Sequence, residues 1–146
     1  MKKLLTALMV GLLALPVMAK PVKNIEQAIE LVERSIIKNK LTELPIQCLM
    51  FIENDVGNDF PYHQIDVREK HNQECGGDPE TAPRLFSYSV NKKKGFLKTD
   101  AIWREDGEEF SGILYPIDPI SPVILYEKGK ERKLKYFVRG SGREIK

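Results

Sequence analysis

The segment YHQIDVREKH (Tyr62–His71) decides the fold class of this chain, because apolar and polar side chains alternate along it. Ile65 and Val67 point to one side of an extended chain, whereas Asp66 and Arg68 point to the other. A period of two is typical of a strand that buries one face and leaves the other in water. We therefore expect a half-buried β-strand over this segment.

Before this segment, the apolar residues follow a helical period. Asn24 is a favourable helix N-cap, and Gln27, three positions later, completes a pair of the capping-box kind. Pro45 stops the pattern. The apolar residues at helical spacing are Ile25, Ala28, Ile29, Val32 and Ile36. The pattern predicts one amphipathic helix from about Ile25 to Lys40.

Further strand patterns lie on both sides of the segment, separated by turn residues. They are Ile46–Glu53, Arg84–Val90, Phe96–Trp103 and Glu109–Tyr115, with a last hairpin of Val123–Glu127 and Leu134–Val138 around Lys128-Gly129-Lys130. Three prolines make Tyr115–Pro122 a crossing loop or a sheet edge. We expect an α+β fold, with one N-terminal amphipathic helix packed on a largely antiparallel, twisted sheet of about five to seven strands.

The start of the chain has the three parts of a secretory signal peptide. Lys2 and Lys3 precede an apolar run of about fourteen residues, and Val17-Met18-Ala19 places small residues before a cleavage point. The run is shorter than the roughly 20 residues of a membrane span. We expect residues 1–19 to be a signal peptide cleaved after Ala19, an address in the periplasm, and a single domain over residues 20–146 that does not span a membrane.

The charge balance argues against a nucleic-acid partner. The chain has 23 Lys and Arg and 21 Asp and Glu, and loss of Lys2 and Lys3 leaves 21 of each, so the net charge becomes zero. The C-terminal segment 121–146 is nevertheless basic, with eight cations against three acids. This hairpin and tail indicate either an acidic partner or anionic surface, or only a solvated end.

The stretch HNQECGGDPETAP (His71–Pro83) concentrates residues that are common in functional sites. Cys48 and Cys75 are the only cysteines of the chain, and in an oxidising compartment an even pair predicts a disulfide. A disulfide removes the free thiolate that a nucleophile needs. We therefore expect no catalytic thiol here.

Two other interpretations of this stretch give a ligand site. A metal site would use His63, His71, Cys75 and Asp78, but only the last three are local and Cys75 is needed for the disulfide. An anion site would use the backbone of Gly76-Gly77, beside the unfavourable charge of Asp78. We favour a pinned turn, without metal or cofactor, whose rim residues His71, Asp78 and Arg84 are available for binding; Asp78 and Arg84 could pair across the mouth of the loop.

The segment VREKHNQECGGDPETAPRLFSYSVNKKKG resembles one that recurs in small exported bacterial proteins of unknown function. Their shared pattern is His-x-x-x-Cys-Gly-Gly-Asp-Pro-x-Thr-x-Pro between two strands, after an amphipathic helix. The resemblance covers roughly Asn24 to Trp103, and the chain from about Glu105 departs from it. It implies an exported α+β protein but no activity.

A shorter segment, Ser111-Gly112-Ile113-Leu114-Tyr115, is similar to the Ser-Gly-x-x-Tyr element of periplasmic inhibitors of c-type lysozyme. In that family the element helps to plug the lysozyme cleft, so the similarity implies a binding role for Tyr115. The long helix near the start of this chain departs from the small barrel of that family.

The residue inventory argues against an enzyme. The chain has two histidines, no serine in a nucleophile-elbow motif and no phosphate-binding loop. We expect a non-catalytic periplasmic binding protein whose partner is another protein of the cell envelope, in sharper form an inhibitor or immunity protein acting on a cell-wall hydrolase. The alternatives are a structural or envelope-stress component that contacts anionic surfaces, and a small-molecule binder.

Overall fold

The structure is a computed structural model that describes residues 20–57 and 59–146. The predicted signal peptide, residues 1–19, lies outside the described residues. The first element is helix α1 (Ile25–Asn39), whose N-cap is Asn24, as the sequence predicts. The Asn24 side chain accepts a hydrogen bond from the Gln27 amide, and the Gln27 side chain accepts one from the Lys23 amide. The first bond satisfies a donor that an uncapped helix would leave unpaired, and the second fixes the chain just before the helix.

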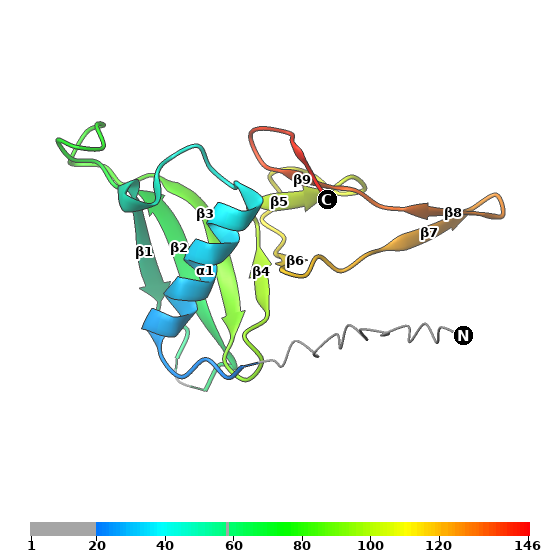
Figure 1. Cartoon of the computed structure of the whole chain (residues 1–146), viewed down its shortest axis with the longest axis horizontal. Helices are drawn as coiled ribbons and strands as arrows, with labels where there is room; N and C mark the ends of the chain where they lie inside the picture. The colour runs from blue at the N-terminus through cyan, green and yellow to red at the C-terminus, as the bar shows by residue number, and fades with distance from the viewer. Residues whose placement is uncertain (1–19, 58) are drawn as a thin grey trace, which may run out of the picture.

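A five-stranded antiparallel sheet forms the larger part of the structure (Figure 1). Its strands, in spatial order, are β1 (Leu49–Asn54), β2 (Tyr62–Glu69), β3 (Arg84–Asn91), β4 (Leu97–Thr99) and β6 (Tyr115–Ile117). A short 3₁₀ turn, η1 (Ile46–Cys48), leads into β1. The expected strand over Tyr62–His71 is therefore β2, which is paired on both of its edges.

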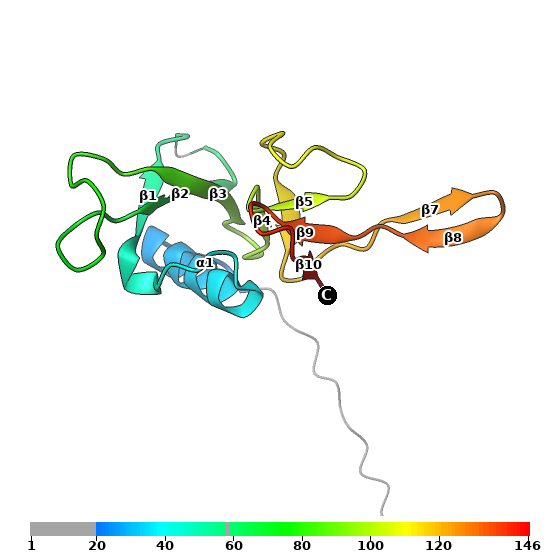
Figure 2. The ribbon, with the colours of Figure 1, turned by 90° about the horizontal axis from the view of Figure 1, so that it is seen from above.

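Helix α1 lies on one face of this sheet, as the two perpendicular views show (Figures 1 and 2). Its buried residues Ala28, Val32 and Ile36 join a core cluster that includes the inward-facing residues of β2 and β3. The buried Tyr88 hydroxyl donates to Ser35 of the helix at 2.9 Å, so burial leaves no orphaned polar group there. Burial raises the pKa of Tyr88 well above its ordinary value.

The remaining strands form two small sheets. One is three-stranded, in the order β10 (Glu144–Ile145), β9 (Tyr136–Val138) and β5 (Ile102–Arg104). The other is a two-stranded ribbon of β7 (Ile124–Glu127) and β8 (Lys130–Lys133), which projects away from the rest of the described chain (Figures 1 and 2). Every strand pair among the described residues is antiparallel.

The prediction of one helix and a mostly antiparallel α+β fold is confirmed, but the strands are divided differently. The expected return strand Phe96–Trp103 is split into β4 and β5, which belong to different sheets. The expected strand Glu109–Tyr115 is a loop up to Leu114, and the last hairpin pairs β7 with β8 rather than with Leu134–Val138. The split follows from the buried Asp100, which is described below, because its side-chain bonds hold a corner between the two strands.

Two arginines tie late segments of the chain to earlier ones. Arg143 donates to the backbone carbonyls of Asn39 and Lys40, where helix α1 ends. A cation at this position also faces the negative end of the helix dipole. Arg132 of β8 pairs with Glu105 at 2.5 Å, which connects the ribbon to the residue after β5. No helix among the described residues has the length and apolar character of a membrane span.

Candidate binding surface

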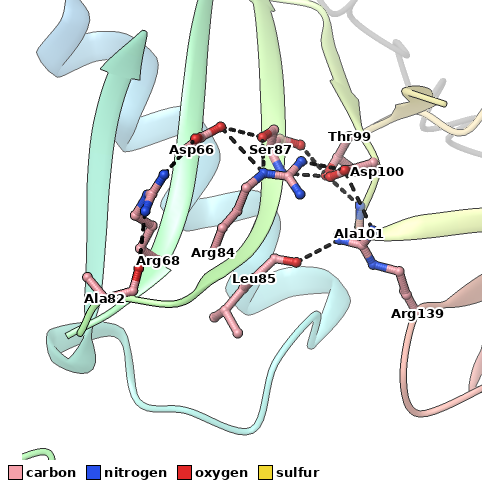
Figure 3. Close-up of polar contacts among 10 residues, drawn as sticks. All are labelled: Asp66, Arg68, Ala82, Arg84, Leu85, Ser87, Thr99, Asp100, Ala101 and Arg139. Atoms are coloured by element: carbon pink, nitrogen blue, oxygen red, sulfur yellow. Dashed lines mark hydrogen bonds and ion pairs between the residues drawn. The ribbon is translucent and has the colours of Figure 1, made fainter. Parts of the chain in front are cut away.

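A buried polar network lies on the sheet face that α1 leaves uncovered (Figure 3). The alternation of β2 and β3 turns Asp66 and Ser87 toward this face. The Ser87 hydroxyl donates to Asp66 at 2.5 Å, and the Ser87 amide donates to Asp100 at 2.6 Å. Asp100 is only 3% exposed and lies between β4 and β5. The network therefore fixes the corner where the chain leaves the large sheet for the small one.

Arginine side chains balance the two buried carboxylates. Arg84 donates to the Ser87 hydroxyl at 2.9 Å and to Asp100 at 2.6 Å. Arg139, which follows β9, lies 3.6 Å from Asp100 and donates to the Leu85 carbonyl at 2.6 Å. Buried charges persist only when they are paired and hydrogen-bonded in this way. The pairs connect β3, the β4–β5 corner and β9.

The electrostatics keep Asp66 ionised. Burial alone would raise the pKa of Asp66, but the hydrogen bond from Ser87 and the charges of Arg84 and Arg68 outweigh it and lower the pKa below its usual value. Arg68 lies 3.5 Å from Asp66 and also donates to the Ala82 carbonyl at 3.2 Å. Ser87 has its hydroxyl occupied by carboxylate and guanidinium groups, so these residues form a structural cluster.

A groove of about 450 Å³ lies beside this network, between the segments 40–43 and 138–141. Leu85 and Arg139 line it, together with Phe110 from the loop 105–114. Phe110 is 75% exposed, and the Arg139 guanidinium lies 5.9 Å from the centre of its ring. Glu109 accepts a hydrogen bond from the Gly140 amide at 2.7 Å, which anchors the loop to the far wall. The loop thus displays an aromatic ring over a cation that the buried network holds in position.

The loop 70–83 contains the Cys-Gly-Gly-Asp-Pro motif, and its conformation is stabilised by a disulfide and by hydrogen bonds within the loop. Cys48 and Cys75 form the predicted disulfide. Asn72 accepts hydrogen bonds from the amides of Glu74 and Cys75, and its backbone pairs with that of Gly76 in both directions. These contacts account for the turn without any ligand.

His71 forms part of this internal fastening. Its Nε2 lies 2.9 Å from the Glu69 carboxylate, and its Nδ1 lies 3.0 Å from the Asp78 carbonyl and 2.9 Å from the Thr81 hydroxyl. The Glu69 carboxylate and the Asp78 carbonyl only accept hydrogen bonds, whereas the Thr81 hydroxyl can donate or accept, so these contacts favour the protonated ring, in which both nitrogens donate. The hydrogen bond to Glu69 accordingly raises the pKa of His71.

Gly77 lies directly against the His71 ring. A Cβ atom at this position would come within 2.5 Å of the imidazole, and the Gly77 backbone has a φ of +82°. Both observations require glycine here. The second glycine of the motif therefore makes room for the histidine rather than for an anion.

The other residues predicted to bind have different positions. Asp78 accepts from the Glu80 amide at 3.0 Å within its own turn. Arg84 does not pair with Asp78 across the loop mouth, as the sequence suggested, because it pairs with Asp100. Tyr115 is 7% exposed and packs edge-on against Tyr136, so its ring belongs to the core and not to a contact surface. His71 and Asp78 are in contact within the loop 70–83, whereas Arg84 and Tyr115 are engaged with other residues.

The metal interpretation finds no geometric support among the described residues. They contain no group of three or more His, Cys, Asp and Glu side chains that could hold an ion. His63 lies 2.7 Å from Glu53 at the other end of β2 from His71. Both cysteines are in the disulfide.

Sequence patterns missed the residues that shape the groove. Phe110 lies in a segment that the alternation assigned to a strand, and Arg139 was counted only within the basic tail. Asp100 gave no local signal, because its partners lie 13 to 39 positions away along the chain. One weak indication of the loop was present in the sequence. The segment Glu105-Asp106-Gly107-Glu108 has the composition of a turn and comes directly before Glu109 and Phe110.

Comparison with known proteins supplies no relative for this chain. No protein-family model, no curated protein and no solved structure matches it.

Proposed function

We propose that this chain is a non-catalytic binding protein of the cell envelope, whose partner is another protein. In this proposal the contact surface is the loop 105–114 with the groove beside it. The observation that carries the proposal is Phe110, an aromatic ring that is 75% exposed yet held over Arg139 and anchored through Glu109. Aromatic and arginine side chains dominate the binding energy of protein interfaces.

The exposed apolar tip of the loop supports the sharper form, an inhibitor or immunity protein that acts on a cell-wall hydrolase. Glycoside hydrolases work with a pair of Asp or Glu side chains in a cleft. A loop with an exposed apolar tip is suited to such a cleft, and its exposed acids Asp106 and Glu108 would then face basic residues around the catalytic pair. Ile113 adds exposed apolar surface to the loop, whereas the guanidinium groups of Arg84 and Arg139 at its base are paired with Asp100.

Affinity capture from a periplasmic extract tests the proposal, followed by a muramidase assay with the captured enzyme. We expect Phe110→Ala to reduce capture at least about fivefold, as for a residue at an interface hot spot. Phe96→Ala is the matched control, because Phe96 is also exposed and also lies beneath a cation, Lys94. Equal capture by the wild type and both variants would remove this surface from the proposal, and a captured hydrolase of unchanged activity would remove the inhibitor form.

A second candidate, contact with an anionic envelope surface, is favoured by the β7–β8 ribbon. All four residues of β8 are exposed, and the ribbon carries Lys128, Lys130 and Lys133 away from the rest of the described chain (Figure 2). Exposed charge attraction weakens with salt. Under this alternative, changing the three lysines to Gln abolishes envelope association at low salt, whereas Phe110→Ala leaves it intact.

A further inference from the structure

The edge strands of the structure are protected to different degrees. A free edge exposes backbone donors and acceptors, and proteins usually blunt it with proline, charge or short length. β6 has only three residues and contains Pro116, and β10 has two residues. The ribbon carries charged residues from Glu127 to Lys133. These edges are all poor templates for a further strand.

β1 is longer, and Glu53 is its one charged residue. Its six residues, LMFIEN, include no proline and no basic side chain, and the only irregularity in the neighbouring pairings lies between β2 and β3. It is the outermost strand of the five-stranded sheet, and no strand of the described chain pairs with its other side. Ile52 on this strand is 43% exposed. An open apolar edge of this length is a site for strand addition.

The register identifies which backbone groups are available. The Lys70 amide donates to the Cys48 carbonyl, and alternate residues of an antiparallel strand face the same neighbour. Met50 and Ile52 therefore direct their backbone groups to β2, whereas Leu49, Phe51 and Glu53 direct theirs outward. The Leu49 amide already donates to the Ile46 carbonyl. The outward edge thus offers the amides of Phe51 and Glu53 and the carbonyls of all three residues.

We infer that the β1 edge binds a second copy of this chain, antiparallel, with the two Phe51 residues facing each other across a two-fold axis. Residue 49 of one copy then faces residue 53 of the other. The Phe51 pair makes two backbone hydrogen bonds, and each Leu49–Glu53 pair makes one, because the Leu49 amide is already occupied. The two five-stranded sheets become one continuous sheet. The inference does not depend on the proposed function.

The side chains of β1 are compatible with this register. On the face away from α1, Met50 of one copy lies beside Ile52 of the other, so that each apolar side chain covers another. On the helix side, Glu53 lies beside Leu49 of the second copy and not beside the other Glu53. Glu53 also keeps its contact with His63, 2.7 Å away within its own protomer. No pair of like charges lies directly opposite in this arrangement.

The loop 70–83 gives the edge a lateral wall. In both perpendicular views it reaches further outward than β1 (Figures 1 and 2). It starts from the end of β2 and is joined to the residue before β1 by the disulfide between Cys75 and Cys48. A second copy at this edge is therefore flanked by a loop that its own internal bonds hold in shape, which adds contact area to the strand pairing.

Sedimentation equilibrium and hydrogen exchange on the purified chain lacking residues 1–19 test the inference together. We expect a dimer at micromolar concentration that dissociates on dilution, with slower exchange of the Phe51 and Glu53 amides in the concentrated sample. Ile52→Lys should raise the dissociation constant at least about tenfold, because it places a charge against Met50 of the second copy. Ile124→Lys, at a residue of similar exposure on β7, should leave it unchanged.

Each result decides the question. A monomer at every concentration up to about 0.5 mM overturns the inference. A dimer that survives Ile52→Lys, or in which Phe51 and Glu53 exchange as in the monomer, also overturns it, because the copies then meet elsewhere. Equal melting temperatures of Ile52→Lys and Ile124→Lys at a concentration where both are monomeric show that neither substitution acts by unfolding the chain.

Discussion

The loops 70–83 and 105–114 both leave the sheets for solvent, but they are built in opposite ways. In the first, the disulfide, Asn72 and His71 are engaged with other residues of the same loop or with the strands beside it. In the second, Phe110 and Ile113 remain exposed, and the tip meets another segment through Glu109 and through the contact of Phe110 with Arg139. The Cys-Gly-Gly-Asp-Pro motif thus serves the stability of the fold, whereas the loop 105–114 displays the surface that we propose for a partner.

The largest effect should follow from opening the disulfide. Cys48 and Cys75 are 27 positions apart, and closing a loop of this length stabilises a fold by roughly 3.5 kcal/mol in the chain-entropy model. We expect Cys48→Ala with Cys75→Ala to lower the free energy of unfolding by about this amount in a urea titration. A loss below about 1 kcal/mol would mean that hydrogen bonds alone hold the loop 70–83, and the contrast between the loops would be weaker.

The next effect concerns the support beneath Phe110. Asp100→Ala removes the partner of Arg84 and Arg139. We expect it to lower the free energy of unfolding by about 2–3 kcal/mol. This loss is smaller than is usual for a buried ion pair, because Arg84 is partly exposed to solvent. Asp106→Ala is the control, because its pair with Arg104 is near the surface and should contribute less than about 1 kcal/mol. Equal losses for the two variants would show that Asp100 is not a structural centre.

The third prediction is a pH dependence confined to the loop 70–83. Because the folded-state pKa of His71 is raised above 6.5, the stabilisation from its protonated ring is complete below that pH and is lost as pH rises through the folded value. We expect the amides of Cys75 and Thr81 to exchange faster as pH rises above 6.5, after correction for intrinsic rates. Glu69→Gln should shift this transition to lower pH, and His71→Gln should abolish it; His63→Gln is the control.

The smallest effect on stability should come from Phe110→Ala. A ring that is 75% exposed contributes little to folding, so the free energy of unfolding should change by no more than about 0.5 kcal/mol. The same substitution should weaken partner capture severalfold, whereas Asp78→Ala should leave capture unchanged. A result in which Asp78 matters and Phe110 does not would reverse the roles that we assign to the two loops.

Local patterns were sufficient for the elements whose partners are close in the sequence. Asn24 and Gln27 predicted the start of α1, the alternation around Ile65 predicted β2, and two cysteines predicted the disulfide. The first two signals depend only on residues within one element. The third depends on there being two cysteines, which can form only one intramolecular disulfide.

The remaining features depend on distant partners. The break after Thr99 cannot be predicted from Phe96–Trp103 itself, because it follows from a carboxylate that bonds Ser87 and two arginines. The position of the Phe110 ring likewise depends on a contact with Arg139, which lies 29 positions later in the sequence. Alternation alone assigned Glu109–Tyr115 to a strand, but only Tyr115 finds a strand partner, in Thr99 of β4.

The contact of Arg143 with the end of helix α1 has a consequence for how the chain is made. Asn39 leaves the ribosome 104 residues before Arg143, so the helix is synthesised long before the side chain that completes its C-terminus. Until then the Asn39 and Lys40 carbonyls must bond water instead. The C-terminal closure of α1 is therefore a late contact of a growing chain, because it needs a side chain that is made only after strands β1 to β9.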